Sequence, residues 1–216
     1  MKNKTIIITT LICLVPIIFG LAIYDKLPEQ VPTHFNFEGE PNGYSSKAFA
    51  VFGLPLMMAF FNLLLVFALN TDPKRKNYSP VIEKISLYIM PVLSILMSAL
   101  TYFKALGSNV PITSITMTFV AVLFIVIGFY MPQIKRNYTM GIKLPWTLDN
   151  DENWEKTHKL GGKLCIVAGV ILFLNVFIKS IVIFVATLII VAIVPMVYSY
   201  MIYGKTKENS AENSSF

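Results

Sequence analysis

The two histidines of this sequence, His34 and His158, are the side chains best suited to acid–base chemistry or metal binding near neutral pH. His34 is followed by Glu38 and Glu40, and these three residues could hold a metal ion, although their spacing matches no established zinc motif. A solvated loop is the simpler explanation. We therefore predict no metal site and no cofactor here.

His158 is accompanied by Glu152 and Lys159 in a segment that reads as helix. On a helix, Glu152 and His158 would project about 120° apart, which opposes a shared catalytic role. We therefore expect a protein that is not an enzyme. One alternative stays open, namely a membrane enzyme or small transporter that acts on lipid or peptide and uses these three residues.

The composition around these residues is that of an integral membrane protein. Of 216 residues, 55% are hydrophobic and only 14% are charged, far from the balance of a soluble domain. About 20 apolar residues cross a bilayer of roughly 30 Å as a helix. The sequence therefore predicts an all-α bundle of six transmembrane helices, drawn over residues 5–24, 48–69, 85–106, 112–131, 164–178 and 181–203.

Few polar side chains interrupt these spans. Asn62 and Asn175 lie inside two of them, and we expect both to form hydrogen bonds between helices. Three small residues at the start of the fifth span, Gly162, Cys165 and Gly169, predict an edge that another helix can approach closely.

The distribution of Lys and Arg predicts the orientation. The N-terminus, the loop at 70–84, the loop at 132–163 and the C-terminal tail together carry 14 of these residues, and the other side carries 4. By the positive-inside rule both termini are cytoplasmic, 25–47 is an external loop and 132–163 is a cytoplasmic loop. Topology thus explains the net charge of +6, and we predict no direct nucleic acid binding.

The external loop LPEQVPTHFNFEGEPNGYSSK is divided into turns by its prolines and glycines. Between these turns, His34, Phe35 and Phe37 form a short patch that could contact an external ligand. The alternative is that the patch packs on the helix bundle.

The cytoplasmic loop contains MGIKLPWTLDNDENWEKTHKLGG, with both tryptophans of the chain. A helix is expected to start near Asn150 and to run through Gly162 into the membrane, with Trp154, His158, Gly161 and Cys165 on one stripe. Trp146 and Trp154 are amphipathic, so we expect them to fix the loop at the inner membrane interface.

These two loops resemble known sequences. The external loop is similar to an N-terminal domain of unassigned function found in many bacterial membrane proteins. The cytoplasmic loop resembles the signature of the SdpI family of bacterial membrane immunity proteins. The matching positions are Asn137, Gly141, Ile142, Pro145, Trp146, Thr147, Trp154, Thr157, His158 and Gly161, and Lys143 stands where arginine is usual.

The resemblance implies a division into residues 1–106, with three spans and the external loop, residues 107–204, with three spans and the cytoplasmic loop, and a polar tail at 205–216. It also implies a multi-pass protein of the bacterial cytoplasmic membrane that gives resistance to a secreted killing peptide.

In the founding system of the family, the presence of the toxin is signalled to a cytoplasmic transcriptional repressor, and the resemblance implies the same role for this protein. The expected partners are then the lipid bilayer, a peptide toxin and a repressor. A receptor without immunity activity is the remaining alternative, and its candidate docking surface is basic: Lys74, Arg75, Lys76, Lys135 and Arg136.

Overall fold

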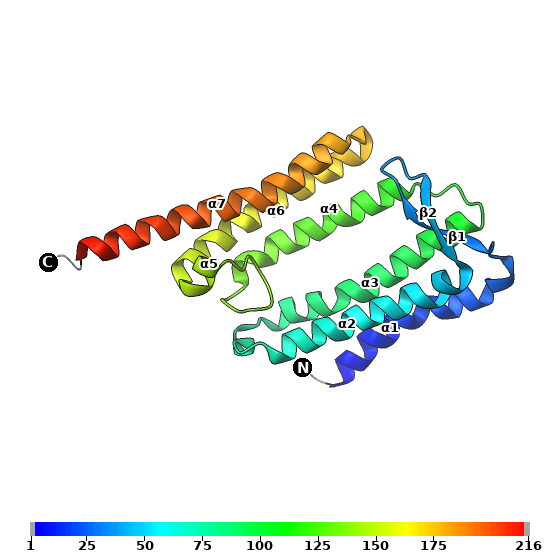
Figure 1. Cartoon of the computed structure of the whole chain (residues 1–216), viewed down its shortest axis with the longest axis horizontal. Coiled ribbons are helices and arrows are strands. Elements are labelled where there is room, and N and C mark those ends of the chain that lie inside the picture. The colour runs from blue at the N-terminus through cyan, green and yellow to red at the C-terminus, as the bar shows by residue number, and fades with distance from the viewer. Residues whose placement is uncertain (1–2, 214–216) are drawn as a thin grey trace. The chain divides into compact units, whose positions relative to one another are not determined.

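The computed structural model describes residues 3–213 of the chain. Six long helices dominate it (Figure 1): α1 (Asn3–Ala22), α2 (Leu54–Thr71), α3 (Pro80–Ala105), α4 (Ile112–Tyr130), α6 (Asp151–Ile178) and α7 (Ile181–Asn213). All six contain a window that is long and apolar enough to cross a membrane. The predicted bundle of six membrane helices is thereby confirmed, while the cytoplasmic placement of the termini stays a prediction.

The chain divides into two compact units. Unit 1 consists of Met1–Thr71 and Pro80–Thr113, and unit 2 consists of Asp72–Ser79 and Ser114–Phe216. The segment between α2 and α3 therefore belongs to unit 2, whereas the two helices themselves belong to unit 1. The division predicted at residues 106 and 204 stays a prediction.

Polar contacts join the three helices of unit 1. The Asn62 side chain on α2 is fully buried and donates to Thr9 Oγ1 at 3.2 Å and Thr10 Oγ1 at 3.0 Å on α1. Ser94 on α3 donates to the Cys13 carbonyl on α1 at 2.7 Å. The expected role of Asn62 between helices is thus observed.

A β-hairpin follows α1 and the short 3-10 helix η1 (Tyr24–Lys26). Strands β1 (Gln30–Phe35) and β2 (Pro41–Ser46) pair antiparallel, with irregular register at His34. Val31 is fully buried against Leu27, Ala50, Val51 and Tyr102, which attaches the hairpin to the helices of unit 1. The sequence predicted only turns in this segment, because short strands that contain Pro32, Pro41 and bulges lack a regular alternation.

The hairpin leads into a π-helical turn, η2 (Phe49–Gly53), which continues into α2. At the hairpin tip, Gly39 has φ +84°, a conformation that favours glycine. Thr113, at the start of α4, donates to the Phe37 carbonyl at 2.9 Å and thereby holds this tip.

In unit 2, glycines let α4 and α6 approach closely. A Cβ at Gly162 would lie 2.8 Å from the Gly128 carbonyl oxygen, and a Cβ at Gly128 would lie 2.7 Å from the Gly162 carbonyl oxygen. Gly169 makes the same kind of approach, at 2.7 Å, to the Ala121 carbonyl. The small-residue edge predicted on the fifth span is therefore the contact between α6 and α4.

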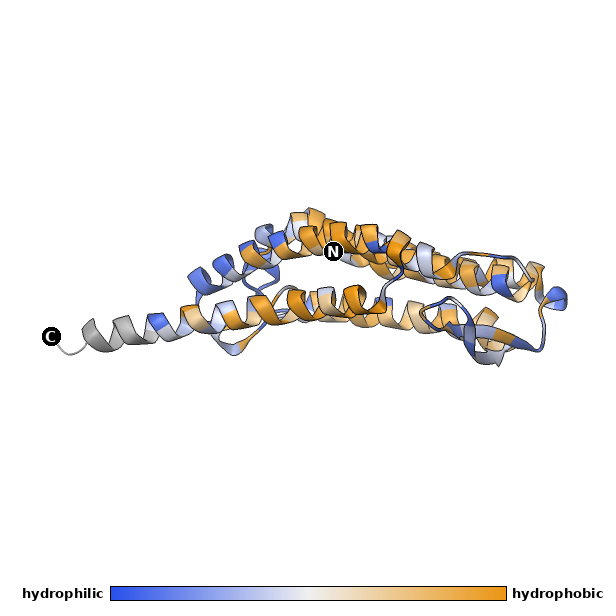
Figure 2. Ribbon diagram, turned by 90° about the horizontal axis from the view of Figure 1, so that it is seen from above, coloured by the Kyte–Doolittle hydropathy of each residue, from blue (hydrophilic) through white to orange (hydrophobic). Residues whose placement is uncertain are grey.

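Helix α6 is longer than the predicted span 164–178. Its 28 residues correspond to about 42 Å, more than the roughly 30 Å of a hydrocarbon core. The ribbon of its first turns is hydrophilic and its later turns are hydrophobic (Figure 2). Asn175 near its end differs from prediction, because it bonds to Ser180 in the turn before α7 and not to another helix.

Candidate functional site in the motif loop

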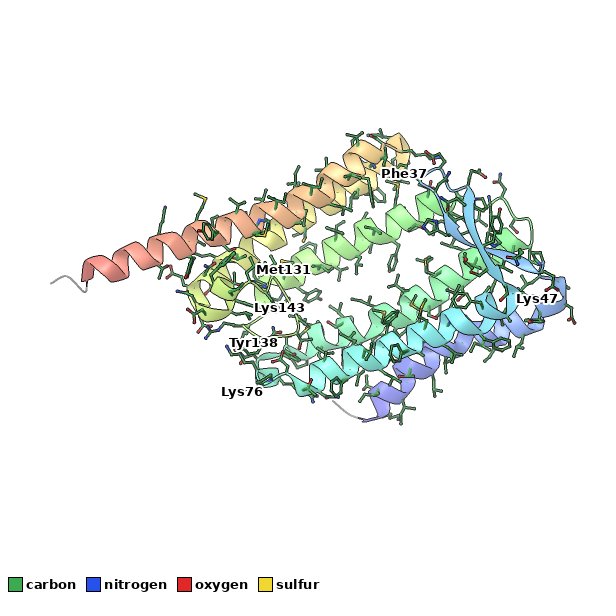
Figure 3. All side chains as sticks on the ribbon, in the orientation of Figure 1. Phe37, Lys47, Lys76, Met131, Tyr138 and Lys143 are labelled. Atoms are coloured by element: carbon green, nitrogen blue, oxygen red, sulfur yellow. The ribbon has the colours of Figure 1, made fainter. Side chains whose placement is uncertain are left out.

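The family-motif residues come together in unit 2. One group lies in residues 134–150, here called the motif loop, which follows the 3-10 helix η4 (Met131–Gln133) and contains the short helix α5 (Pro145–Asp149). The other group, Trp154, Thr157, His158 and Gly161, lies in the first turns of α6, where all four are buried. Figure 3 shows Tyr138 and Lys143 close together in this loop.

Helix α6 begins as predicted. Asn150 has extended backbone angles and its side-chain oxygen accepts from the Asn153 amide at 2.9 Å, which makes it the N-cap. Asp151 and Glu152 follow in the first turn, where negative charge is favourable. The stripe of α6 that carries Trp154 and His158 faces the motif loop, because both side chains bond to backbone groups of that loop.

His158 joins the motif loop to α6. Its ring is fully buried, with Nδ1 2.8 Å from the Trp154 carbonyl and Nε2 3.0 Å from the Ile142 amide. The carbonyl can only accept and the amide can only donate, so the hydrogen bonds require a neutral ring with the proton on Nδ1. Both nitrogens are therefore occupied by the backbone, which suits a structural role better than proton transfer.

Gly141 lets the loop pass over the histidine. Its φ is +103°, and a Cβ there would collide with His158 Nε2 and lie 3.2 Å from the Trp154 ring. Gly161 on α6 serves the same approach from the other side, because its Cβ would lie 2.8 Å from the Ile142 side chain. Both glycines of the motif are thus explained by close packing.

Trp154 is a packing residue. Its side chain is 3% exposed, its indole N–H donates to the Ile134 carbonyl at 2.7 Å, and its ring stacks on His158 with centroids 4.0 Å apart. A ring so covered has almost no surface for the membrane interface. The structure therefore differs from the interfacial position predicted for Trp154, because both polar and apolar parts of the indole find partners inside the protein.

Asn137 and Thr147 shape the two ends of the loop. The buried Asn137 side chain accepts from the amides of Thr139 and Met140, at 2.9 and 2.7 Å, and donates to the Lys135 carbonyl. Thr147, also fully buried, has its hydroxyl 2.9 Å from both the Ile142 carbonyl and the Leu144 amide. These are turn and helix-start contacts, and Pro145 at the first position of α5 fits them.

Lys143 stands where the family pattern usually has arginine. Its ammonium group is exposed and donates to the carbonyls of Tyr138 and Thr139, at 3.3 and 2.9 Å. One ammonium thus reaches two backbone acceptors without the planar fork of arginine. In this chain, position 143 closes the loop on itself.

Trp146 joins α5 to α7. Its indole N–H donates to Ser199 Oγ at 2.8 Å, and its ring lies 5.4 Å from Tyr200 and 6.2 Å from Tyr203, measured between centroids. Ser199 is fully buried, and its carbonyl also accepts from the Asn153 side chain on α6 at 2.9 Å. Ser199 therefore joins three helices of unit 2, a role that sequence reasoning missed.

Asp72 was also missed, although it organises the loop. Its carboxylate accepts from the Lys74 amide at 2.8 Å and the Tyr78 hydroxyl at 2.6 Å within its own segment. It also accepts from the Tyr138 amide at 2.9 Å and the Thr139 hydroxyl at 2.8 Å in the motif loop. The signal in the sequence was an acidic residue at a helix end among basic ones.

The charge of Asp72 is stabilised by these donors. Burial alone would raise the pKa of the carboxyl group, but the hydrogen bonds outweigh it and lower the pKa below its ordinary value. Burial, together with the bond to Asp72, raises the pKa of the Tyr78 phenol. The carboxylate is therefore ionised and the phenol neutral across the physiological range.

The predicted basic surface is partly engaged in this site. Arg136 forms an ion pair with Asp151, with Nε 2.7 Å from Oδ1, and donates to the Leu148 carbonyl at 2.8 Å. The Lys74 ammonium lies 5.2 Å from the centre of the Tyr138 ring. These two cations thus have partners within unit 2.

The residues of the enzyme alternative are not brought together. Glu152 pairs with Lys156 and Lys159 with Glu155, each at 2.6 Å along α6, whereas His158 faces the motif loop. Among residues 3–213, no group of three or more His, Cys, Asp or Glu side chains is placed to hold a metal ion.

The second predicted patch lies in unit 1, on the hairpin. His34 is exposed and its Nδ1 lies 2.5 Å from the Asn42 side-chain oxygen across the strands. Phe35 and Phe37 are half-buried. Phe37 and Lys47 mark the two ends of this hairpin region in Figure 3. The patch therefore offers one oriented histidine and two partly covered aromatic rings.

Comparison with known sequences agrees with these two regions. Residues 133–199 match the model of the SdpI/YfhL protein family, and residues 11–59 match a domain of unknown function, DUF1648. The chain is 25% identical over 211 residues to "Immunity protein SdpI" of Bacillus subtilis (strain 168). The aligned region covers 94% of this chain and 97% of the relative. No solved structure gives a significant match.

The matched family region spans the motif loop, α6 and most of α7, and the matched DUF1648 region includes the hairpin. Both resemblances predicted from the loops are confirmed. The chain is thus a multi-pass protein of the bacterial cytoplasmic membrane in which a region that matches the DUF1648 model precedes a region that matches the SdpI/YfhL model.

Proposed function

We propose that this protein protects the cell that makes it, or a neighbour, against a secreted membrane-active killing peptide. The observation that carries the proposal is the similarity over 94% of the chain to a relative named as an immunity protein. The motif loop has a structural part in this proposal, since His158, Thr147 and Trp154 bond to backbone groups and hold its shape.

The hairpin is the proposed site of contact with the peptide. His34 is exposed, and Phe35 and Phe37, close to it in the sequence, are half-buried, a combination that offers hydrogen bonding and apolar contact to an amphipathic ligand. Under the proposed orientation, with both termini in the cytoplasm, this hairpin lies outside the cell.

The orientation can be tested by cysteine labelling. Cys13 and Cys165 are free and buried, so they contribute little background. A membrane-impermeant maleimide added to intact cells should label an Asn42→Cys variant and should leave a Lys143→Cys variant unlabelled until the cells are opened. Labelling in the reverse order would contradict the orientation.

The function itself can be tested by survival. Cells sensitive to the killing peptide of the matched family are transformed with this chain or with an empty vector, and survival is measured across peptide doses beside membrane protein level. Survival above the vector control would support immunity. Death at the vector dose despite a normal membrane level would contradict protection against that peptide.

Signalling to a cytoplasmic repressor is a second proposed function. The observation that favours it is the segment Asp72–Ser79, which is covalently continuous with α2 and α3 of unit 1 but bonds through Asp72 to the motif loop. A displacement of those helix ends would act directly on the loop. The basic residues beside it form the proposed repressor dock: Lys74, Arg75, Lys76, Lys135 and Arg136.

This second function predicts that a fluorescent fusion of the repressor moves to the membrane when the peptide is added, and that Asp72→Asn abolishes the movement. Membrane recruitment that is unchanged in the variant would contradict a route through Asp72.

A further inference from the structure

Three aromatic rings from two elements form one cluster in unit 2. Trp146 comes from α5, and Tyr200 and Tyr203 come from α7. Their centroids are separated by 5.4 Å for Trp146 and Tyr200, 6.2 Å for Trp146 and Tyr203, and 6.4 Å for Tyr200 and Tyr203. Every ring is therefore within contact distance of the other two.

The spacing decides between two uses of an aromatic cluster. Rings that bind an ammonium group stand apart, so that the cation sits near the face of each ring. Here the rings are in contact with one another, with Trp146 edge-on to Tyr200 at 71°. The cluster therefore has no space for a cation between its rings, and what it presents to a partner is its outer surface.

That surface is partly open. Tyr200 is 60% exposed, and Trp146 and Tyr203 are half-buried. The Trp146 ring is also fixed in orientation, because its N–H bonds to the buried Ser199. The cluster thus combines a rigid apolar body with phenolic groups, which is the chemistry suited to the boundary between hydrocarbon and headgroups.

The position of the cluster along α7 agrees with that boundary. Tyr200 lies 19 residues after Ile181, about 29 Å along the helix, close to the thickness of a hydrocarbon core. The intervening surface is apolar and exposed, as at Val182, Ile190 and Val197. Lys205, also exposed, follows about 8 Å beyond Tyr200.

We propose that Trp146, Tyr200 and Tyr203 form a lipid-contact surface at the level of the phospholipid headgroups and glycerol esters. Because Trp146 belongs to α5, this surface places the motif loop directly on the membrane surface. The sequence predicted the same depth for both tryptophans, and the structure assigns it to Trp146 alone. The proposal holds whether or not the protein confers immunity.

The test uses the fact that the chain has two tryptophans. A Trp154→Phe variant reports Trp146, and a Trp146→Phe variant reports Trp154. Each full-length protein is reconstituted into phosphatidylcholine and phosphatidylglycerol vesicles whose acyl chains carry bromine near the glycerol or near the bilayer centre, and tryptophan fluorescence is measured.

We expect Trp146 to lose at least half of its fluorescence to the shallow bromines and clearly less to the deep ones, and Trp154, which is 3% exposed, to lose little to either. If Trp154→Phe fails to fold, the fluorescence of Trp146 is obtained by subtracting the fluorescence of Trp146→Phe from that of the wild type. Absence of shallow quenching for Trp146, or stronger deep quenching, would overturn the proposal.

A protein partner is the competing occupant of this surface. If a second copy covered the cluster, shallow quenching of Trp146 would be weak at high protein density and would rise on dilution with excess lipid. If shallow quenching of Trp146 stays constant while the protein is diluted twentyfold with lipid, contact with lipid is supported. If this quenching rises severalfold, the lipid-contact proposal is overturned.

Discussion

The hairpin and the motif loop are both short segments between membrane helices, yet they use their distinctive residues in opposite ways. In the motif loop, Asn137, Thr147 and His158 are fully buried and bonded to backbone groups. On the hairpin, His34 is exposed and its ring bonds to a neighbouring side chain, Asn42. The difference teaches that a family motif can mark residues that hold a shape, while contact residues lie elsewhere.

The strongest test of this contrast is Gly141→Ala. The new Cβ would meet His158 Nε2 while the backbone keeps φ +103°, so we expect a loss of several kcal/mol and little folded protein. The unfolding temperature in detergent and the membrane level would both show it.

Gly107→Ala is the matched control, since Gly107 has φ +80° but nothing within 4 Å of a Cβ. It should cost only the backbone strain, about 1 kcal/mol. Equal effects of the two substitutions would mean that the packing of the motif loop on His158 is not as described.

A somewhat smaller effect is expected from His158→Ala. The change removes the acceptor of the Ile142 amide and the ring that stacks on Trp154, which should cost about 3 kcal/mol. Function should fall together with membrane level. A normal level with abolished function would instead favour the enzyme alternative.

Next in size is Asp72→Asn, which keeps the shape of the side chain but replaces one acceptor by an NH2 donor. At the Oδ2 position that donor faces the Tyr138 amide and the Thr139 hydroxyl, and at the Oδ1 position it faces the Lys74 amide. We expect a loss of about 2 kcal/mol at pH 7 and a lower unfolding temperature. Asp25→Asn, at an exposed carboxylate, should change the unfolding temperature little.

The comparison of wild type with Asp72→Asn also predicts a pH dependence of stability. Because the folded-state pKa of Asp72 is lowered, its stabilisation is fully present above the unfolded value of about 3.9 and is lost as the pH falls through the folded value. The stability difference between wild type and Asp72→Asn should therefore shrink only below about pH 4. A difference that disappears near pH 6 would exclude Asp72 as its source.

The smallest effect on stability is expected on the hairpin. His34→Ala should change the free energy of unfolding by about 0.5 kcal/mol or less, because the side chain is exposed, and yet it should reduce protection against the peptide. Gln30→Ala, at another exposed position of β1, is the control and should leave protection unchanged. Equal protection by the two variants would remove His34 from the contact site.

Much of the fold could be predicted because it depends on local patterns. Six apolar runs predicted six membrane helices, and Asn150 ahead of two acidic residues predicted the start of α6. Trp154, His158 and Gly161 fall on one stripe of α6, as helical periodicity predicted, and all three are buried. Each of these follows from residues within a few turns of one another.

The missed features depend on partners far apart in the sequence. Asp72 bonds to residues 66 and 67 positions away, and Ser199 bonds to Trp146 across 53 positions. A local pattern could single out Asp72 as an acidic residue among basic ones, but it could not identify these partners. Trp146 and Trp154 are the same residue type in one segment, and only the packing shows that Trp146 is half-buried whereas Trp154 is buried.

The most direct test of the proposed division of roles is survival under the killing peptide, divided by membrane protein level, for wild type, His34→Ala and His158→Ala in one strain. We predict that His34→Ala loses survival at an unchanged level, and that His158→Ala loses survival only in proportion to its reduced level. Full survival of His34→Ala, together with a loss in His158→Ala at normal level, would contradict the division and would place function in the motif loop.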